Sequence, residues 1–162
     1  NIKEYKKLFY ELKEKIPGVS ITTDIIVGFP NETEEDFQKT IDIYNELKYD
    51  LAYTFIYSPR EGTPASTMKD NVPKEVKEER LQRLNKVVNK YARENNEKYL
   101  NKVVPVLIEG YSDKGNKLMG YTDTMKLVNV EADPSYIGKI ADIYITEVKT
   151  WSMEGVLNSD RN

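Results

Sequence analysis

The 162-residue chain contains no cysteine and no histidine. Without these side chains it offers no thiolate nucleophile, no imidazole base, no disulfide and none of the usual zinc ligands. Any chemistry that depends on a metal ion or a metal cluster must therefore take its ligands from outside this chain.

Long apolar runs are also lacking. No stretch approaches the roughly 18 apolar residues that a membrane span requires, and the opening residues NIKEYKKLFYELKEKI have a charged amphipathic pattern unlike a secretory signal. A hydrophobic content of 39% with 31% charged residues is typical of a folded, soluble chain. These features predict a cytoplasmic protein with no membrane partner.

The chain has little excess of positive charge. Its formal net charge is −3, and only residues 74–98 contain more basic than acidic side chains. Proteins that bind nucleic acid usually carry a clear basic footprint. Charge alone therefore gives weak support for nucleic-acid binding.

The first half alternates helical and β-rich patterns. Residues 2–16 have apolar side chains at helical spacing, and residues 20–27 are rich in β-branched side chains. A second helical pattern reaches to about residue 48, and residues 51–57 are again β-rich. This rhythm predicts a parallel α/β sheet. Two strands cannot close a barrel or bury both faces of a sheet, so this half is expected to be a piece of a larger α/β domain.

A Gly-Phe-Pro turn follows the first predicted strand, in the stretch DIIVGFPNETEEDF. Asn31 is the predicted N-cap of the next helix, with Glu34 completing a capping box. The four acidic residues between 32 and 36 would repel a phosphate from the helix N-terminus. The turn therefore favours a neutral, hydroxylated or cationic ligand, and the alternative is that the acids only stabilise the helix.

The second half begins with a long predicted helix after Pro73, whose length suits a connection between two domains. From Val103 on, about five short β-rich runs predict a small antiparallel barrel of the OB-like kind. Trp151 is predicted to lie in the core of this barrel. The expected domains are residues 1–98 and residues 99–158.

Four motifs in this order, TTDIIVGFPNETEEDF, FIYSPREGTPA, VPKEVKEERLQRL and ITEVKTWSMEGVL, resemble the carboxyl-terminal part of a MiaB-type tRNA methylthiotransferase. That family consists of radical S-adenosylmethionine enzymes. The resemblance implies that residues 1–98 are the end of a TIM-like radical barrel with a connecting helix, and that residues 99–158 are a TRAM domain, a small RNA-contacting β-barrel. It also implies that amino-terminal domains of the same protein carry the ligands of two iron–sulfur clusters.

The resemblance further implies a binding site for S-adenosylmethionine at the turn. Gly28 would let the backbone approach the cofactor closely, and Pro30 would fix the turn. For Asp24 a purely structural hydrogen-bonding role stays open. No catalytic and no metal-binding residue is expected in this chain. The implied cofactor-binding residues are Asp24, Gly28, Phe29, Pro30, Glu32, Tyr57 and Ser58.

RNA contacts are expected from basic and aromatic residues, and stacking on bases is the alternative to a core position for Trp151. An arginine at the position of Arg60 resembles the pattern of the tRNA-modifying branch of the family. Its guanidinium could bind a phosphate through two N–H donors, and the alternative is a surface salt bridge. The segment around Gly120 is less basic than the resemblance would suggest. The implied RNA-binding residues are Arg60, Lys102, Lys117, Tyr121, Lys126 and Lys149. The residues Arg80, Arg83, Lys86 and Lys90 of the long helix are expected to add positive charge near the RNA.

The resemblance implies part of an enzyme that adds a methylthio group to an adenosine beside the anticodon, one already carrying a prenyl group. The partner would be the tRNA anticodon stem-loop, and the fragment alone would be inactive. Two alternatives stay open: a non-catalytic RNA-binding module, or a methylthiotransferase acting on threonylcarbamoyl-adenosine or on a ribosomal protein.

Overall fold

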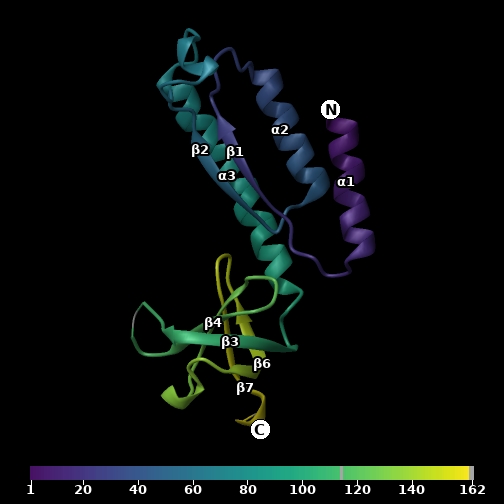
Figure 1. Cartoon of the computed structure of the whole chain (residues 1–162), viewed down its shortest axis with the longest axis vertical. Coiled ribbons are helices and arrows are strands. Elements are labelled where there is room, and N and C mark those ends of the chain that lie inside the picture. Colours follow the sequence, from purple (N-terminus) through teal and green to yellow (C-terminus); the bar gives the residue numbers. More distant parts are fainter. Residues whose placement is uncertain (114, 161–162) are drawn as a thin grey trace. The chain divides into compact units, whose positions relative to one another are not determined.

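The computed structural model describes residues 1–113 and 115–160 (Figure 1). It contains two compact units, one from Asn1 to Tyr91 and one that starts at Ala92. Among the described residues, no helix combines the length and the apolar content needed to cross a bilayer.

The first unit alternates helices with strands, as predicted, and its two strands run parallel. The register pairs Thr22 with Leu51 at one end and Val27 with Ile56 at the other. Its elements are α1 (Ile2–Lys15), β1 (Thr22–Val27), α2 (Glu34–Leu47), β2 (Leu51–Ile56), the 3-10 turn η1 (Pro64–Thr67) and α3 (Lys74–Glu97), which continues into the second unit.

The start of α2 differs from the prediction. Its N-cap is Thr33, whose hydroxyl accepts a hydrogen bond from the Asp36 N–H at 3.1 Å while the Asp36 carboxylate accepts from the Thr33 N–H. Asn31 adopts the left-handed φ of 69°, and its N–H donates to the Asn71 side chain at 2.8 Å. The predicted cap at Asn31 is wrong because an N-cap needs an extended backbone, which Thr33 has.

One face of the β1–β2 sheet packs into a core with the helices. Phe37 and Tyr44 of α2 and Leu84 and Val88 of α3 are buried, and Val27 joins them from β1. The helix residues among them have the predicted helical spacing, so the predicted apolar faces of the two helices are the faces that are buried.

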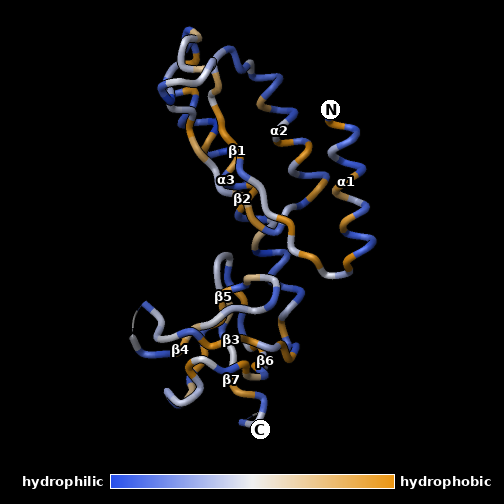
Figure 2. The backbone as a smooth tube through the Cα atoms, viewed as in Figure 1, coloured by the Kyte–Doolittle hydropathy of each residue, from blue (hydrophilic) through white to orange (hydrophobic). Residues whose placement is uncertain are grey.

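The side chains on the opposite face of the same sheet are exposed. Both strands nevertheless contain hydrophobic residues, drawn in orange in Figure 2. Ile26 lies directly opposite Phe55 in the register, and Asp24 lies opposite Tyr53. The three apolar side chains are each more than half exposed, at 54% for Ile26, 51% for Phe55 and 56% for Tyr53. Exposed apolar residues on adjacent strands mark a face that lacks a covering layer.

The second unit contains a closed barrel with the strand order β3-β4-β5-β7-β6. The predicted five-stranded OB-like barrel is confirmed, except that β5 and β7 run parallel instead of antiparallel. β7 follows β6 in an antiparallel hairpin and then lies beside β5, whose direction it shares. The strands are β3 (Val103–Tyr111), β4 (Leu118–Tyr121), β5 (Leu127–Val130), β6 (Ile140–Val148) and β7 (Met153–Leu157), with 3-10 turns η2 (Pro134–Tyr136) and η3 (Asn158–Asp160).

The barrel core is filled by alternate residues of the strands. Val106, Val128, Ile143 and Met153 are fully buried, which matches the inward and outward alternation expected for such strands. Trp151 is 54% exposed, so its predicted core position is wrong. It lies in the connection between β6 and β7, outside the alternation that directs strand residues inward.

Candidate functional site

The Gly-Phe-Pro turn after β1 is fixed by side chains of α3. Gly28 has a φ of 72°, and its N–H donates to the Glu32 carboxylate at 3.1 Å. A Cβ atom at Gly28 would lie 2.4 Å from Cγ of Lys77. The glycine is therefore needed for the packing of Lys77, a close contact that the sequence did not reveal.

The acidic groups around this turn are partly neutralised. Arg80 is buried and donates to the Glu32 carboxylate at 2.8 Å and to the Glu32 carbonyl at 3.1 Å. Arg83 donates to Glu34 at 2.7 Å, and this hydrogen bond lowers the pKa of the Glu34 carboxyl. Arg80, which is expected to add positive charge near the RNA, is buried, and its charge is paired with that of Glu32.

The other predicted cofactor residues differ in exposure. Phe29 is 41% exposed and contacts the Tyr57 ring edge to face at 5.1 Å, while Tyr57 itself is buried and donates its hydroxyl hydrogen to the Ala65 carbonyl. Asp24 and Ser58 are exposed, and Pro30 is buried. Within residues 1–113 and 115–160, no three acidic, cysteine or histidine side chains gather to hold a metal ion.

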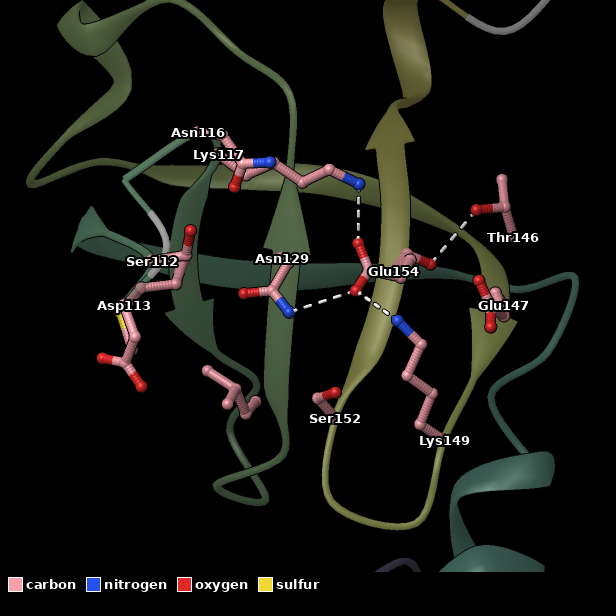
Figure 3. Close-up of a pocket in the computed structure, with 12 residues that line it drawn as sticks. Ser112, Asp113, Asn116, Lys117, Asn129, Thr146, Glu147, Lys149, Ser152 and Glu154 are labelled. Carbon is pink, nitrogen blue, oxygen red and sulfur yellow. Dashed lines mark hydrogen bonds and ion pairs between the residues drawn. The ribbon is translucent and has the colours of Figure 1, made fainter.

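The second unit has a pocket of about 650 Å³ on its outer surface (Figure 3). Three regions line it: the connection between β3 and β4, the outward residues Met119 of β4 and Asn129 of β5, and the hairpin of β6 and β7. In OB-folds the second and third strands, together with the loops after the first and fourth strands, form the surface that binds oligonucleotides. The pocket occupies the equivalent place in this barrel.

Glu154 lies at the centre of the pocket, between two lysines (Figure 3). Lys117 donates to one carboxylate oxygen at 2.8 Å, and Lys149 donates to the other at 2.9 Å. Asn129 adds a weaker hydrogen bond at 3.3 Å. The pocket thus collects two cationic side chains and an amide around one anion.

The charges in the pocket stabilise one another. Burial raises the pKa of the Glu154 carboxyl, but the hydrogen bonds from Lys117, Lys149 and Asn129 outweigh burial, so the net shift is downward. The hydrogen bond to Glu154 raises the pKa of both lysines. All three groups are therefore charged near neutral pH.

Two aromatic side chains flank this surface. Tyr121 lies opposite Leu127 in the register of β4 and β5, and Leu127 lines the pocket. Trp151 is exposed in the hairpin between the lining residues Lys149 and Ser152. Tyr121 is partly exposed and Trp151 is more than half exposed. Accessible aromatic rings beside cationic groups are the elements from which single-stranded nucleic acid surfaces are built.

Comparison with known proteins identifies the second unit, since residues 97–157 match the family model of the TRAM domain. These residues form a TRAM domain. The matched segment contains all five strands of the barrel.

Nearly the whole chain is similar to part of longer bacterial proteins. It is 54% identical over 155 residues to the tRNA-2-methylthio-N(6)-dimethylallyladenosine synthase of Bacillus cytotoxicus, a match that covers 95% of this chain and 30% of the relative. The proteins of the same name from Bacillus anthracis and Bacillus cereus are 55% and 56% identical over 154 residues, 94% of this chain. The chain spans about 30% of the length of these relatives. These matches confirm the resemblance to the tRNA methylthiotransferases.

The TRAM domain brings together only some of the residues predicted to bind RNA. Lys117 and Lys149 meet at Glu154, and Tyr121 lies on the same outer face. Lys102 is exposed just before β3, and Lys126 lies in the β4–β5 connection, so neither lines the pocket. Arg60 is exposed in a loop of the first unit.

Sequence reasoning missed Glu154 and Asn129. Glu154 lies between the buried residues Met153 and Gly155 of β7, and Asn129 lies between Val128 and Val130 of β5. Strict alternation along these two short strands would have placed both polar side chains on the outer face. That pattern was the available signal.

Proposed function

We propose that this chain is part of an enzyme that adds a methylthio group to a prenylated adenosine beside the tRNA anticodon. The observation that carries this proposal is 54% identity over 95% of the chain to proteins named tRNA-2-methylthio-N(6)-dimethylallyladenosine synthase. The same name favours a dimethylallyladenosine substrate over threonylcarbamoyl-adenosine or a ribosomal protein. The cytoplasm, where tRNA is modified, is the proposed location.

Bound S-adenosylmethionine and two iron–sulfur clusters would supply radical chemistry in the complete enzyme. The cluster ligands must come from other parts of that protein, because this chain has no cysteine. The exposed residues Asp24, Phe29 and Ser58 fit one wall of the cofactor site, since they lie on the open face of β1 or at the carboxyl ends of the parallel strands. Asp24 would accept hydrogen bonds from ribose hydroxyls or the ammonium group, and Phe29 would exclude water.

The exposed face of β1 and β2 supports the assignment to a larger α/β domain. Ile26, Tyr53 and Phe55 would be covered when further strands complete the sheet, as in the interior of a parallel barrel. Tyr57, Pro30 and Gly28 would then act behind the cofactor wall, because they are buried in this unit. Glu32 would hold the turn through its contacts with Gly28 and Arg80.

A test of the activity uses the full-length protein, expressed in a bacterium whose own methylthiotransferase gene has been deleted. Mass spectrometry of the tRNA nucleosides is expected to show methylthio-dimethylallyladenosine. A methylthio group found only on threonylcarbamoyl-adenosine would show that the protein is a methylthiotransferase for that nucleoside instead. Unmodified tRNA with an intact, cluster-loaded protein would favour a ribosomal protein as the substrate. Unmodified tRNA with a folded protein that binds no cluster would favour the non-catalytic RNA-binding module.

The TRAM domain is proposed to bind the anticodon stem-loop through its pocket face. The support is the coincidence of Lys117, Lys149, Tyr121 and Trp151 with the surface that OB-folds use for oligonucleotides. Lys102, Lys126 and Arg60 are proposed to add contacts at its margins or from the first unit.

Replacing both Lys117 and Lys149 with alanine is expected to weaken binding of an anticodon stem-loop RNA about tenfold at low salt. It should also flatten the dependence of log affinity on log salt by up to about 1.4, since each lost single-strand phosphate contact removes about 0.7. Filter binding across a salt series measures both quantities. The matched control replaces the exposed lysines Lys3 and Lys7 of α1 with alanine and should leave binding unchanged.

A further inference from the structure

The two lysines of the TRAM pocket are directed to the same carboxylate. Lys117 and Lys149 lie on separate segments, yet their ammonium groups are 2.8 and 2.9 Å from the two oxygens of Glu154. Asp113 and Glu147 also line the pocket, so among the described lining residues two cations meet three anions. The pocket therefore presents no net positive charge to an approaching phosphate.

The exposure of the three side chains indicates how this arrangement could change. The Glu154 side chain is only 15% exposed, whereas Lys117 is 31% and Lys149 is 48% exposed. Both ammonium groups reach solvent and have three donors each, so they could turn from Glu154 to a phosphate without leaving the surface. Glu154 is held in place by its own strand and by Asn129, and it would remain where it is.

We propose that Glu154 competes with RNA phosphate groups for Lys117 and Lys149, and thereby limits the affinity of the TRAM domain for RNA. This inference rests on the proposed binding of RNA at the pocket. The ions released on binding are the cations condensed on the RNA phosphates. A phosphate that takes a lysine from Glu154 leaves this carboxylate without its partner and able to hold a cation, so few cations are released on balance. Glu154 thus lowers both the strength and the salt dependence of binding, and it disfavours RNA that offers phosphates but no further contacts.

The decisive variant is Glu154→Gln in the 162-residue chain. It is expected to bind an anticodon stem-loop RNA about tenfold more tightly at low salt. Two full single-strand phosphate contacts contribute a slope of about 1.4, and the salt dependence should steepen by the part of this slope that Glu154 withholds from the two lysines in the unsubstituted protein. The matched control is Glu109→Gln, which makes the same charge change at an exposed position of β3. This control should alter affinity less than about twofold, because Glu109 does not line the pocket and an exposed charge is screened by salt.

A folding control keeps the result interpretable. Glutamine preserves the size of Glu154 and can still accept a hydrogen bond, so the barrel should remain folded. Circular dichroism and thermal unfolding check this, and Glu154→Asn serves as a second neutral variant. Adding Lys117→Ala and Lys149→Ala to the Glu154→Gln variant should abolish the gain, because the freed lysines are its source.

The outcomes separate this inference from the proposed RNA site. If Glu154→Gln binds no better than Glu109→Gln while the double lysine variant still weakens binding, the competition by Glu154 is disproved and the RNA site stands. If neither the lysine nor the Glu154 substitutions change binding, RNA does not contact the pocket and both proposals fall. A gain in Glu154→Gln that exceeds that of Glu109→Gln and disappears when Lys117 and Lys149 are also replaced confirms the competition, whereas a gain that persists without the two lysines disproves it.

Discussion

A Gly120→Ala variant is expected to prevent the TRAM barrel from forming. Gly120 of β4 pairs with Ile108 of β3, and a Cβ atom there would lie 2.1 Å from the Leu107 carbonyl oxygen. The obstacle is backbone that belongs to the neighbouring strand, so no rotation of a side chain relieves the clash. Overpacking of a core usually costs about 1–3 kcal/mol, and a clash with fixed backbone should exceed that range.

The matched control for Gly120 is Gly110→Ala in the adjacent strand β3. Among residues 1–113 and 115–160, apart from the two chain neighbours of Gly110, no atom lies within 4 Å of a Cβ built there, so this variant should fold like the parent. Urea unfolding can be followed by fluorescence, because Trp151 is the only tryptophan of the chain and lies in this unit. A Gly120→Ala variant as stable as Gly110→Ala would show that β3 and β4 can separate without loss of the barrel.

An Arg80→Ala variant is expected to destabilise the first unit by about 3–5 kcal/mol, the usual cost of removing one partner from a buried ion pair. The side chain of Arg80 is 5% exposed and that of Glu32 is 13% exposed, so water would screen the remaining carboxylate poorly. The same substitution removes the contact of the guanidinium with the Phe37 ring, 5.8 Å from its centroid. Glu32 in turn accepts from Gly28, so the turn after β1 should loosen as well.

Amide hydrogen exchange measures this effect where it occurs. Exchange of β1 and α2 should become faster in Arg80→Ala, while exchange of the barrel strands should stay the same. The control is Arg93→Ala, which removes an exposed ion pair with Glu97 and should change little. Unchanged protection of β1 and α2 in Arg80→Ala would show that the turn does not depend on the buried guanidinium.

The helices and strands of this fold follow closely from the sequence because the apolar residues of each one recur at a clear helical or alternating spacing. Alternation in residues 140–145 placed Ala141, Ile143 and Ile145 inside the barrel, and helical spacing placed Phe37 and Tyr44 in the core of the first unit. The predictions were wrong in turns and at the ends of elements, where the spacing of apolar residues gives no information. The N-cap moved from Asn31 to Thr33 because the turn geometry is set by Asn71, which is distant in sequence.

The sequence predicted several individual residues of the candidate site, but it did not predict which oppositely charged residues form ion pairs there. Lys117 and Lys149 were expected at the RNA surface, but their common partner Glu154 depends on how three strands close into a barrel. Arg80 looked like part of a basic helix surface, whereas its partner Glu32 is far away in the chain. Which opposite charges meet is a property of tertiary packing, and spacing along a single sequence does not encode it.

The position of β7 within the barrel has a consequence for the order in which the protein is made. Met153–Leu157 is the last strand of the barrel in sequence, yet it lies between β5 and β6. While the chain emerges from the ribosome, β3 to β6 can pair only partly, and β5 and β6 each keep an unpaired edge. Such edges are templates for pairing with other chains. The nascent barrel is therefore open to aggregation until residues 153–157 have left the exit tunnel, and it closes only after its other four strands have been made.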